Sequence, residues 1–80
     1  MSEYHQHIGR RVELREKVSG LRMSAASHLE SLRMALDPVT DFLNLDEEKI
    51  VRLAVALGEE ISEGKGAAAK IEAINKIIGK

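Results

Sequence analysis

Residues 14–36 read LREKVSGLRMSAASHLESLRMAL, and their apolar side chains recur at the spacing of one helical face. Successive members lie 4, 3, 4, 4, 3 and 4 residues apart, which is the period of an amphipathic helix. No proline interrupts the segment, although Gly20 weakens it by about 1 kcal/mol relative to alanine. We therefore predict a long helix over residues 7–36, whose buried stripe consists of Leu14, Val18, Leu21, Ala25, Leu29, Leu32 and Leu36.

The ends of this helix carry their own signals. We expect residues 1–6 to fray, because they extend beyond the apolar stripe. Asp37 precedes Pro38, and the residue before a proline avoids helical geometry, so the helix should end there. We predict a short helical turn over residues 38–43, with Phe42 anchored in the core.

A second long helix is predicted over residues 46–63. Asp46 is a good N-cap, and Glu47 and Glu48 suit the positive end of the helix dipole. The apolar face of this helix is wide enough to contact two neighbours at once. It comprises Ile50, Val51, Leu53, Ala54, Val55, Leu57 and Ile61.

Two glycines, Gly64 and Gly66, predict that this helix stops and that a third helix follows over residues 67–78. The third helix is short, so it must dock on a neighbour. The sequence thus predicts one all-α domain over residues 1–80. In it the long N-terminal helix packs against two shorter helices, as a helical hairpin or three-helix bundle.

A chain of 80 residues buries a small fraction of its surface, so its core is marginal. Small domains add disulfides, metals or partner subunits, and a chain without cysteine has no disulfide. We therefore expect two copies to pair into a larger bundle. The residues predicted for self-association are Leu14, Val18, Leu21, Ala25, Leu29 and Leu32.

Four arginines, Arg11, Arg15, Arg22 and Arg33, lie on one flank of the apolar stripe. Charged residues beside an apolar stripe commonly set partner choice and orientation. Residues 37–63 carry two basic and eight acidic side chains, so the arginines are expected to pair with glutamates of that segment. The alternative is a strip that binds an anion or a nucleic acid.

No catalytic, cofactor or metal site is expected. The chain has no cysteine, and its serines and histidines stand in no motif of a nucleophilic enzyme. No stretch approaches the roughly 20 apolar residues that span a bilayer, and the N-terminus lacks the basic and apolar regions of a secretory signal. We therefore expect a cytoplasmic protein that does not bind membranes.

These observations favour a helical protein–protein interaction module without catalytic activity, acting as a homodimer or with another helical partner. One alternative is a nucleic-acid-associated regulator that uses the arginine strip. It is less favoured because the middle of the chain is acidic. The other alternative is an adaptor or subunit that folds fully only with a different protein partner.

Overall fold

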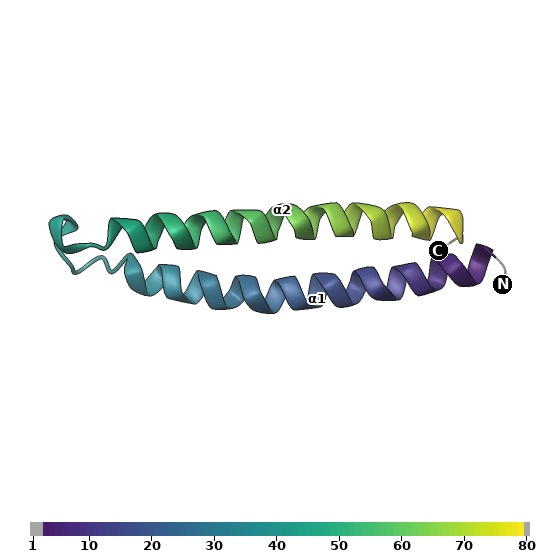
Figure 1. Ribbon diagram of the computed structural model, residues 1–80, viewed down its shortest axis with the longest axis horizontal. Helices are drawn as coiled ribbons and strands as arrows, with labels where there is room; N and C mark the ends of the chain where they lie inside the picture. Colours follow the sequence, from purple (N-terminus) through teal and green to yellow (C-terminus); the bar gives the residue numbers. More distant parts are fainter. Residues whose placement is uncertain (1–2, 80) are drawn as a thin grey trace.

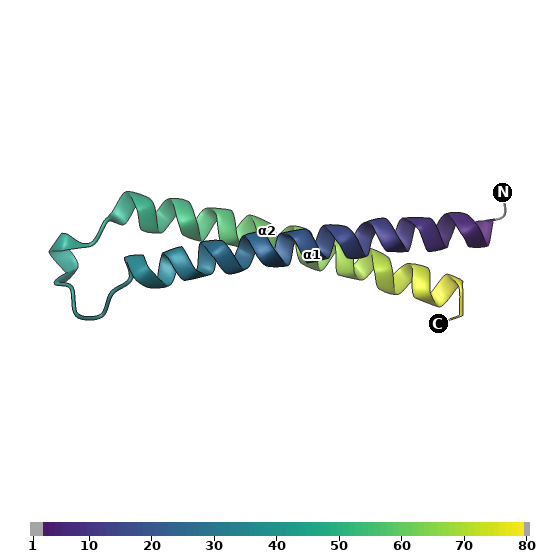
Figure 2. The same cartoon turned by 90° about the horizontal axis from the view of Figure 1, so that it is seen from below.

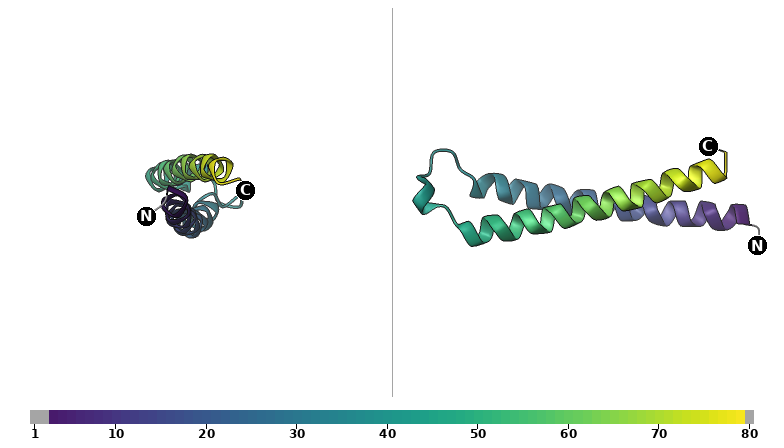
Figure 3. Two further views of the ribbon diagram at one scale, coloured as in Figure 1. Left: turned by 90° about the vertical axis from the view of Figure 1, so that its right-hand side faces the viewer. Right: turned by 90° about the horizontal axis from the view of Figure 1, so that it is seen from above.

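The computed structural model describes residues 3–79 and is a hairpin of two antiparallel helices (Figure 1). Helix α1 spans Glu3–Ala35, helix α2 spans Glu47–Ile77, and a short 3₁₀ turn, η1, spans Phe42–Asn44 in the connection. The molecule is a rod of 60 × 18 × 15 Å. Viewed from its end it has two layers, one helix each (Figure 3). The prediction of an all-α fold is therefore confirmed.

Helix α1 begins at Glu3, so residues 3–6 are helical where the sequence predicted fraying. Residues 1 and 2 lie outside the described residues. Helix α1 ends at Ala35, one residue before the predicted end. Leu36 still donates its backbone N–H to the carbonyl of Leu32, and Asp37 and Pro38 then prevent a further helical turn.

The predicted break at residues 64–66 is wrong, because α2 runs through both glycines without interruption. The separate helices over 46–63 and 67–78 are one helix of 31 residues. Glycine costs a helix about 1 kcal/mol, and packing on a neighbouring helix outweighs a local cost of that size. Ala67 and Ile74, which follow the glycines, are both buried. The glycine that ends α2 is Gly79, whose φ of 76° is the left-handed conformation of a C-terminal cap.

The two helices meet along one seam that follows a seven-residue repeat. They cross near their middle in the view of Figure 2. On α1 the positions of this repeat from residue 11 onward, all partly or fully buried, are Arg11, Leu14, Val18, Leu21, Ala25, His28, Leu32 and Ala35. On α2 and its C-cap they are Ile50, Leu53, Leu57, Glu60, Gly64, Ala67, Ile71, Ile74 and Ile78. The predicted stripe and this seam share the positions from Leu14 to Ala25 and Leu32. The seam takes His28 and Ala35 in place of Leu29 and Leu36, because a helix wrapped around a partner repeats every 3.5 residues.

The core lies at the end of the rod that holds the chain termini. Its buried residues are Leu14, Ala67 and Ile74, with Val18, Ile71 and Ile78 packed against them. Towards the connecting loop, the described chain buries no large apolar side chain. Leu29, predicted for the buried stripe, keeps 46% of its surface exposed. The buried side chains of the seam therefore lie at the terminal end of the rod, and the seam side chains at the loop end are only partly buried.

Three aspartates shape the connection between the helices. Asp37 accepts hydrogen bonds from the backbone N–H of Val39 and from the hydroxyl of Thr40, each at 3.0 Å. Asp41 caps η1 through the backbone N–H of Leu43, at 3.2 Å. Asp46 caps α2 through that of Lys49, at 3.1 Å, as predicted. The predicted turn over 38–43 instead forms at Phe42–Asn44, because Asp37 is used in the tight turn before it.

Phe42 is not the predicted core anchor, since 74% of its surface is exposed. The connection projects past the ends of both helices, where no third layer exists to receive an aromatic ring (Figure 1). Leu43 beside it is also exposed. The predicted three-helix packing is absent from residues 3–79, and the tip of the hairpin is apolar.

The continuity of α2 predicts that Gly66→Ala stabilises the protein. A Cβ at Gly66 meets no atom within 4 Å, so alanine should contribute about 1 kcal/mol of helix propensity. Such a gain raises the melting temperature by roughly 4–8 °C in a domain of this size, measurable by circular dichroism. Gly79→Ala is the matched control and should lower it, because alanine disfavours a positive φ. An unchanged or lower melting temperature for Gly66→Ala would contradict the expected gain in helix propensity at this position.

Candidate functional site

The seam leaves two open flanks along the hairpin, and they differ in chemistry. On the first, which we call the apolar flank, a groove brings together Arg22 of α1 with Ile61, Lys65 and Ala68 of α2. At helical spacing, the same side of each helix also carries large apolar residues. The apolar flank comprises Val12, Arg15, Ser19, Arg22, Ala26, Leu29 and Arg33 of α1, the adjoining Leu36, and Val51, Ala54, Gly58, Ile61, Lys65, Ala68 and Glu72 of α2.

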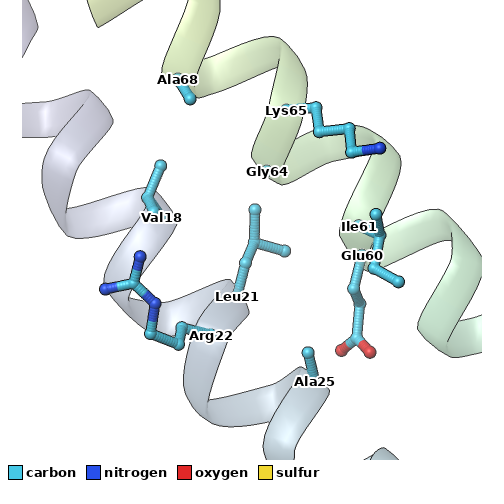
Figure 4. Close-up of a pocket in the computed structure, with 9 residues that line it drawn as sticks. All are labelled: Val18, Leu21, Arg22, Ala25, Glu60, Ile61, Gly64, Lys65 and Ala68. Carbon is cyan, nitrogen blue, oxygen red and sulfur yellow. The ribbon is translucent and has the colours of Figure 1, made fainter.

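The groove on the apolar flank has a volume of about 290 Å³ and is lined by residues from the middle parts of both helices. Figure 4 shows these residues. Val18 and Leu21 point from α1 towards the space between the helices. Gly64 faces this space from α2 without a side chain, and a Cβ there would meet no atom within 4 Å. Ala25 and Ala68 are also small. The groove is therefore hollow because small residues occupy positions where a closed two-helix seam has large ones.

The opposite side, which we call the polar flank, is lined by charged side chains. Its groove has a volume of about 410 Å³ and is bordered by Arg10, Glu13, Lys17, Glu63 and Lys70. Arg10 and Glu13 form an exposed ion pair at 3.8 Å within α1. This flank has the character of a solvated helix surface.

A polar layer interrupts the apolar seam at His28 and Glu60. The imidazole Nδ1 of His28 donates to a carboxylate oxygen of Glu60 at 2.7 Å. The hydroxyl of Ser24 donates to the other oxygen of the same carboxylate. These hydrogen bonds, first from Ser24 and then from His28, lower the pKa of Glu60 below its ordinary value. Two side chains of α1 thus hold the carboxylate of Glu60, on α2, in its charged form.

A second polar layer lies near the chain termini. Arg11 donates through Nη1 to the side-chain oxygen of Asn75 at 2.9 Å. The Nε of Arg11 is buried and has no hydrogen-bond partner among the described residues. Arg11 is therefore part of the seam and does not belong to an exposed arginine strip.

The structure places the predicted site residues in two groups. Leu14 and Val18 pack against α2 within the chain, and Leu21, Ala25 and Leu32 also occupy the seam. Leu29 lies on the apolar flank. Self-association through this stripe stays a prediction, but most of the stripe is already used inside one hairpin.

The remaining arginines, Arg15, Arg22 and Arg33, are exposed on the apolar flank. Within residues 3–79 they form no ion pair, so the expected pairing with Glu59, Glu60 and Glu63 is not seen. Glu60 is bonded to His28 instead. These three guanidinium groups are left for water or for a partner.

Glu60 and Asn75 were not predicted as seam residues, whereas helical spacing places His28 at the edge of the predicted apolar stripe, where a packed, hydrogen-bonded histidine is expected. A strict seven-residue repeat counted from Leu14 reaches His28, and the same repeat counted from Leu53 reaches Glu60. The repeat was hidden because a search for apolar side chains alone selects Leu29 and Ile61, each the next residue in the chain.

Neither α1 nor α2 contains a stretch that is both long and apolar enough for a membrane crossing. Between residues 3 and 79, no three acidic, histidine or cysteine side chains gather as metal ligands.

The lowered pKa of Glu60 predicts a loss of stability in acid. Its hydrogen bonds stabilise the fold fully above the ordinary glutamate pKa of about 4.3, and the contribution is lost as pH falls through the lowered folded value. Urea unfolding between pH 6 and pH 3 should show a shallower decline for Glu60→Gln than for the native chain. Glu59→Gln, at the exposed neighbour, should keep the native slope. Equal slopes in the two variants would contradict this role for Glu60.

The Arg11–Asn75 layer predicts a coupling between two positions distant in sequence. Asn75→Leu leaves the partly buried guanidinium without its acceptor and should cost about 1 kcal/mol. In Arg11→Leu/Asn75→Leu both polar groups are gone, and stability should return to the native value or above it. A double-mutant cycle by chemical denaturation measures the coupling. Additive effects would show that the contact contributes nothing to the hairpin.

Comparisons of the chain with protein-family models, with curated proteins and with solved structures give no match.

Proposed function

We propose that this protein is a helical interaction module, without catalytic activity, that associates with a second copy of itself. The observation that carries the proposal is its large exposed area. The hairpin exposes 6168 Å², whereas a compact monomer of 8.8 kDa exposes about 4,800 Å². The excess is about 1,400 Å² per chain, which is more than one partner contributes to an interface of standard size.

The thin core supports the same proposal. Only Leu14, Ala67 and Ile74 are buried among residues 3–79, although the chain is 44% apolar. A single seam between two helices buries one stripe of each helix. The remaining apolar residues stay exposed unless another surface packs against them. Val51, Leu29 and Ile61 all remain about half exposed or more. An additional pair of helices would cover them, as in a four-helix bundle.

Protein binding accounts for the arginine strip better than nucleic-acid binding does. Arg11 is hydrogen-bonded to Asn75, which leaves three arginines of the predicted strip over the length of α1. Two of them, Arg22 and Arg33, alternate with Ala26, Leu29 and Leu36. Arginine beside apolar side chains is typical of protein interfaces.

The proposal predicts a molar mass of two chains in solution. Sedimentation equilibrium or light scattering across a hundredfold concentration range measures it directly. Because association stabilises the folded state by mass action, the melting temperature should also rise with protein concentration. A monomer at every concentration, with a concentration-independent melting temperature, would contradict self-association. Poor thermal cooperativity in such a monomer would favour the adaptor that folds with a different protein.

A further inference from the structure

We propose that the second copy docks on the apolar flank with its connecting loop at the opposite end, so that a two-fold axis passes through the groove at Gly64. This inference rests on the proposed self-association and specifies its surface and orientation. It follows from the position of the groove, from the charge along the rod and from the exposed residues at the two ends.

The groove lies where two antiparallel copies cross a two-fold axis. Arg11 bonds to Asn75 and His28 to Glu60, so residues 20 and 66 lie at about the same level, near mid-length. Close to a two-fold axis, each residue of one copy faces the identical residue of the other copy. Small side chains there let two helices approach closely, and Gly64 and the two alanines of the groove provide them. The long side chains of Arg22 and Lys65 stand at its border and can extend their charges to water.

Charge along the rod favours loops at opposite ends. The loop half, residues 21–66, has nine acidic and five basic side chains. The terminal half, residues 3–20 and 67–79, has four acidic and six basic ones. With loops at opposite ends, the acidic half of each copy lies beside the basic half of the other. With loops at the same end, two acidic halves would repel each other.

The unpaired arginines fit this arrangement. Arg15 lies in the terminal half on the apolar flank and forms no ion pair within residues 3–79. In the proposed dimer it lies beside the loop half of the partner, where carboxylates outnumber basic groups. Arginine pairs well with carboxylates at interfaces, because its planar guanidinium offers several donors.

The ends of the rod carry matching apolar residues. Phe42 and Leu43 are exposed at the loop, and Tyr4 and Val12 are exposed near the termini. The proposed orientation brings the loop of one copy to the terminal end of the other. In this orientation the exposed apolar residues at each end of one copy lie beside exposed apolar residues of the other. If the two copies were displaced along the rod, the apolar residues near the termini would project past the partner and stay exposed.

Paired glutamine variants test the docking surface. Ile61→Gln and Leu29→Gln each place a helix-compatible polar group on the apolar flank, from α2 and α1 respectively. Each should raise the dissociation constant of the dimer at least tenfold, measured by sedimentation. Ser62→Gln changes the exposed neighbour of Ile61 and should leave it unchanged. Helicity at high concentration should stay native in all three variants, which separates lost association from lost folding.

Spin labels test the orientation. Because the chain has no cysteine, Val39→Cys in the exposed loop gives one labelling site per copy. The expected distance between the two labels is close to the 60 Å length of the rod. A short distance would place the loops together and overturn the proposed orientation. A dimer whose dissociation constant ignores both glutamine variants would overturn the docking surface and leave self-association standing. A monomer at every concentration would overturn self-association and this inference together.

Discussion

A hairpin of two helices has only one seam, and the rest of this protein follows from that constraint. Each helix buries one stripe against the other, and every apolar residue outside the stripe faces solvent. The chain supplies more apolar residues than one seam can cover, from Val12 at one end to Val51 near the loop. Its folded surface is accordingly larger than that of a compact domain of the same mass. Association is the direct way to remove that surface from water.

Polar residues in the seam fix how the two helices align. A purely apolar seam of Leu, Ile and Ala would tolerate a shift of one helix past the other, because its residues are similar in shape. A shift would separate His28 from Glu60 and Arg11 from Asn75 and leave partly buried polar groups without partners. These layers therefore contribute alignment more than stability, as single polar residues do in coiled coils. Correct alignment also places Gly64 and Ala25 together at the groove.

The helices, the N-cap at Asp46 and the inward stripe up to Ala25 could be predicted from local pattern, because these features depend on neighbours in sequence. The continuity of α2 through Gly64 and the exposure of Phe42 could not. Gly64 stays helical because α1 holds the flanking residues, and Phe42 is exposed because the expected third layer does not form. Leu29 gave way to His28 in the seam because the choice depends on the residue opposite, Glu60. Pairings across the hairpin are invisible to a local pattern.

The buried core and the exposed apolar residues of the loop half lie in different parts of the hairpin, and this separation affects how the proposed interaction module would bind a partner. The buried cluster around Leu14 and Ile74 lies at the terminal end, so the hairpin closes there without help from a partner. The loop half has no such cluster, and local opening is easiest where few apolar contacts hold the helices. A surface of that kind can adjust its two helices to a partner while the terminal end keeps them together. Binding would then order the loop half, and the cost of that ordering would reduce affinity without reducing selectivity.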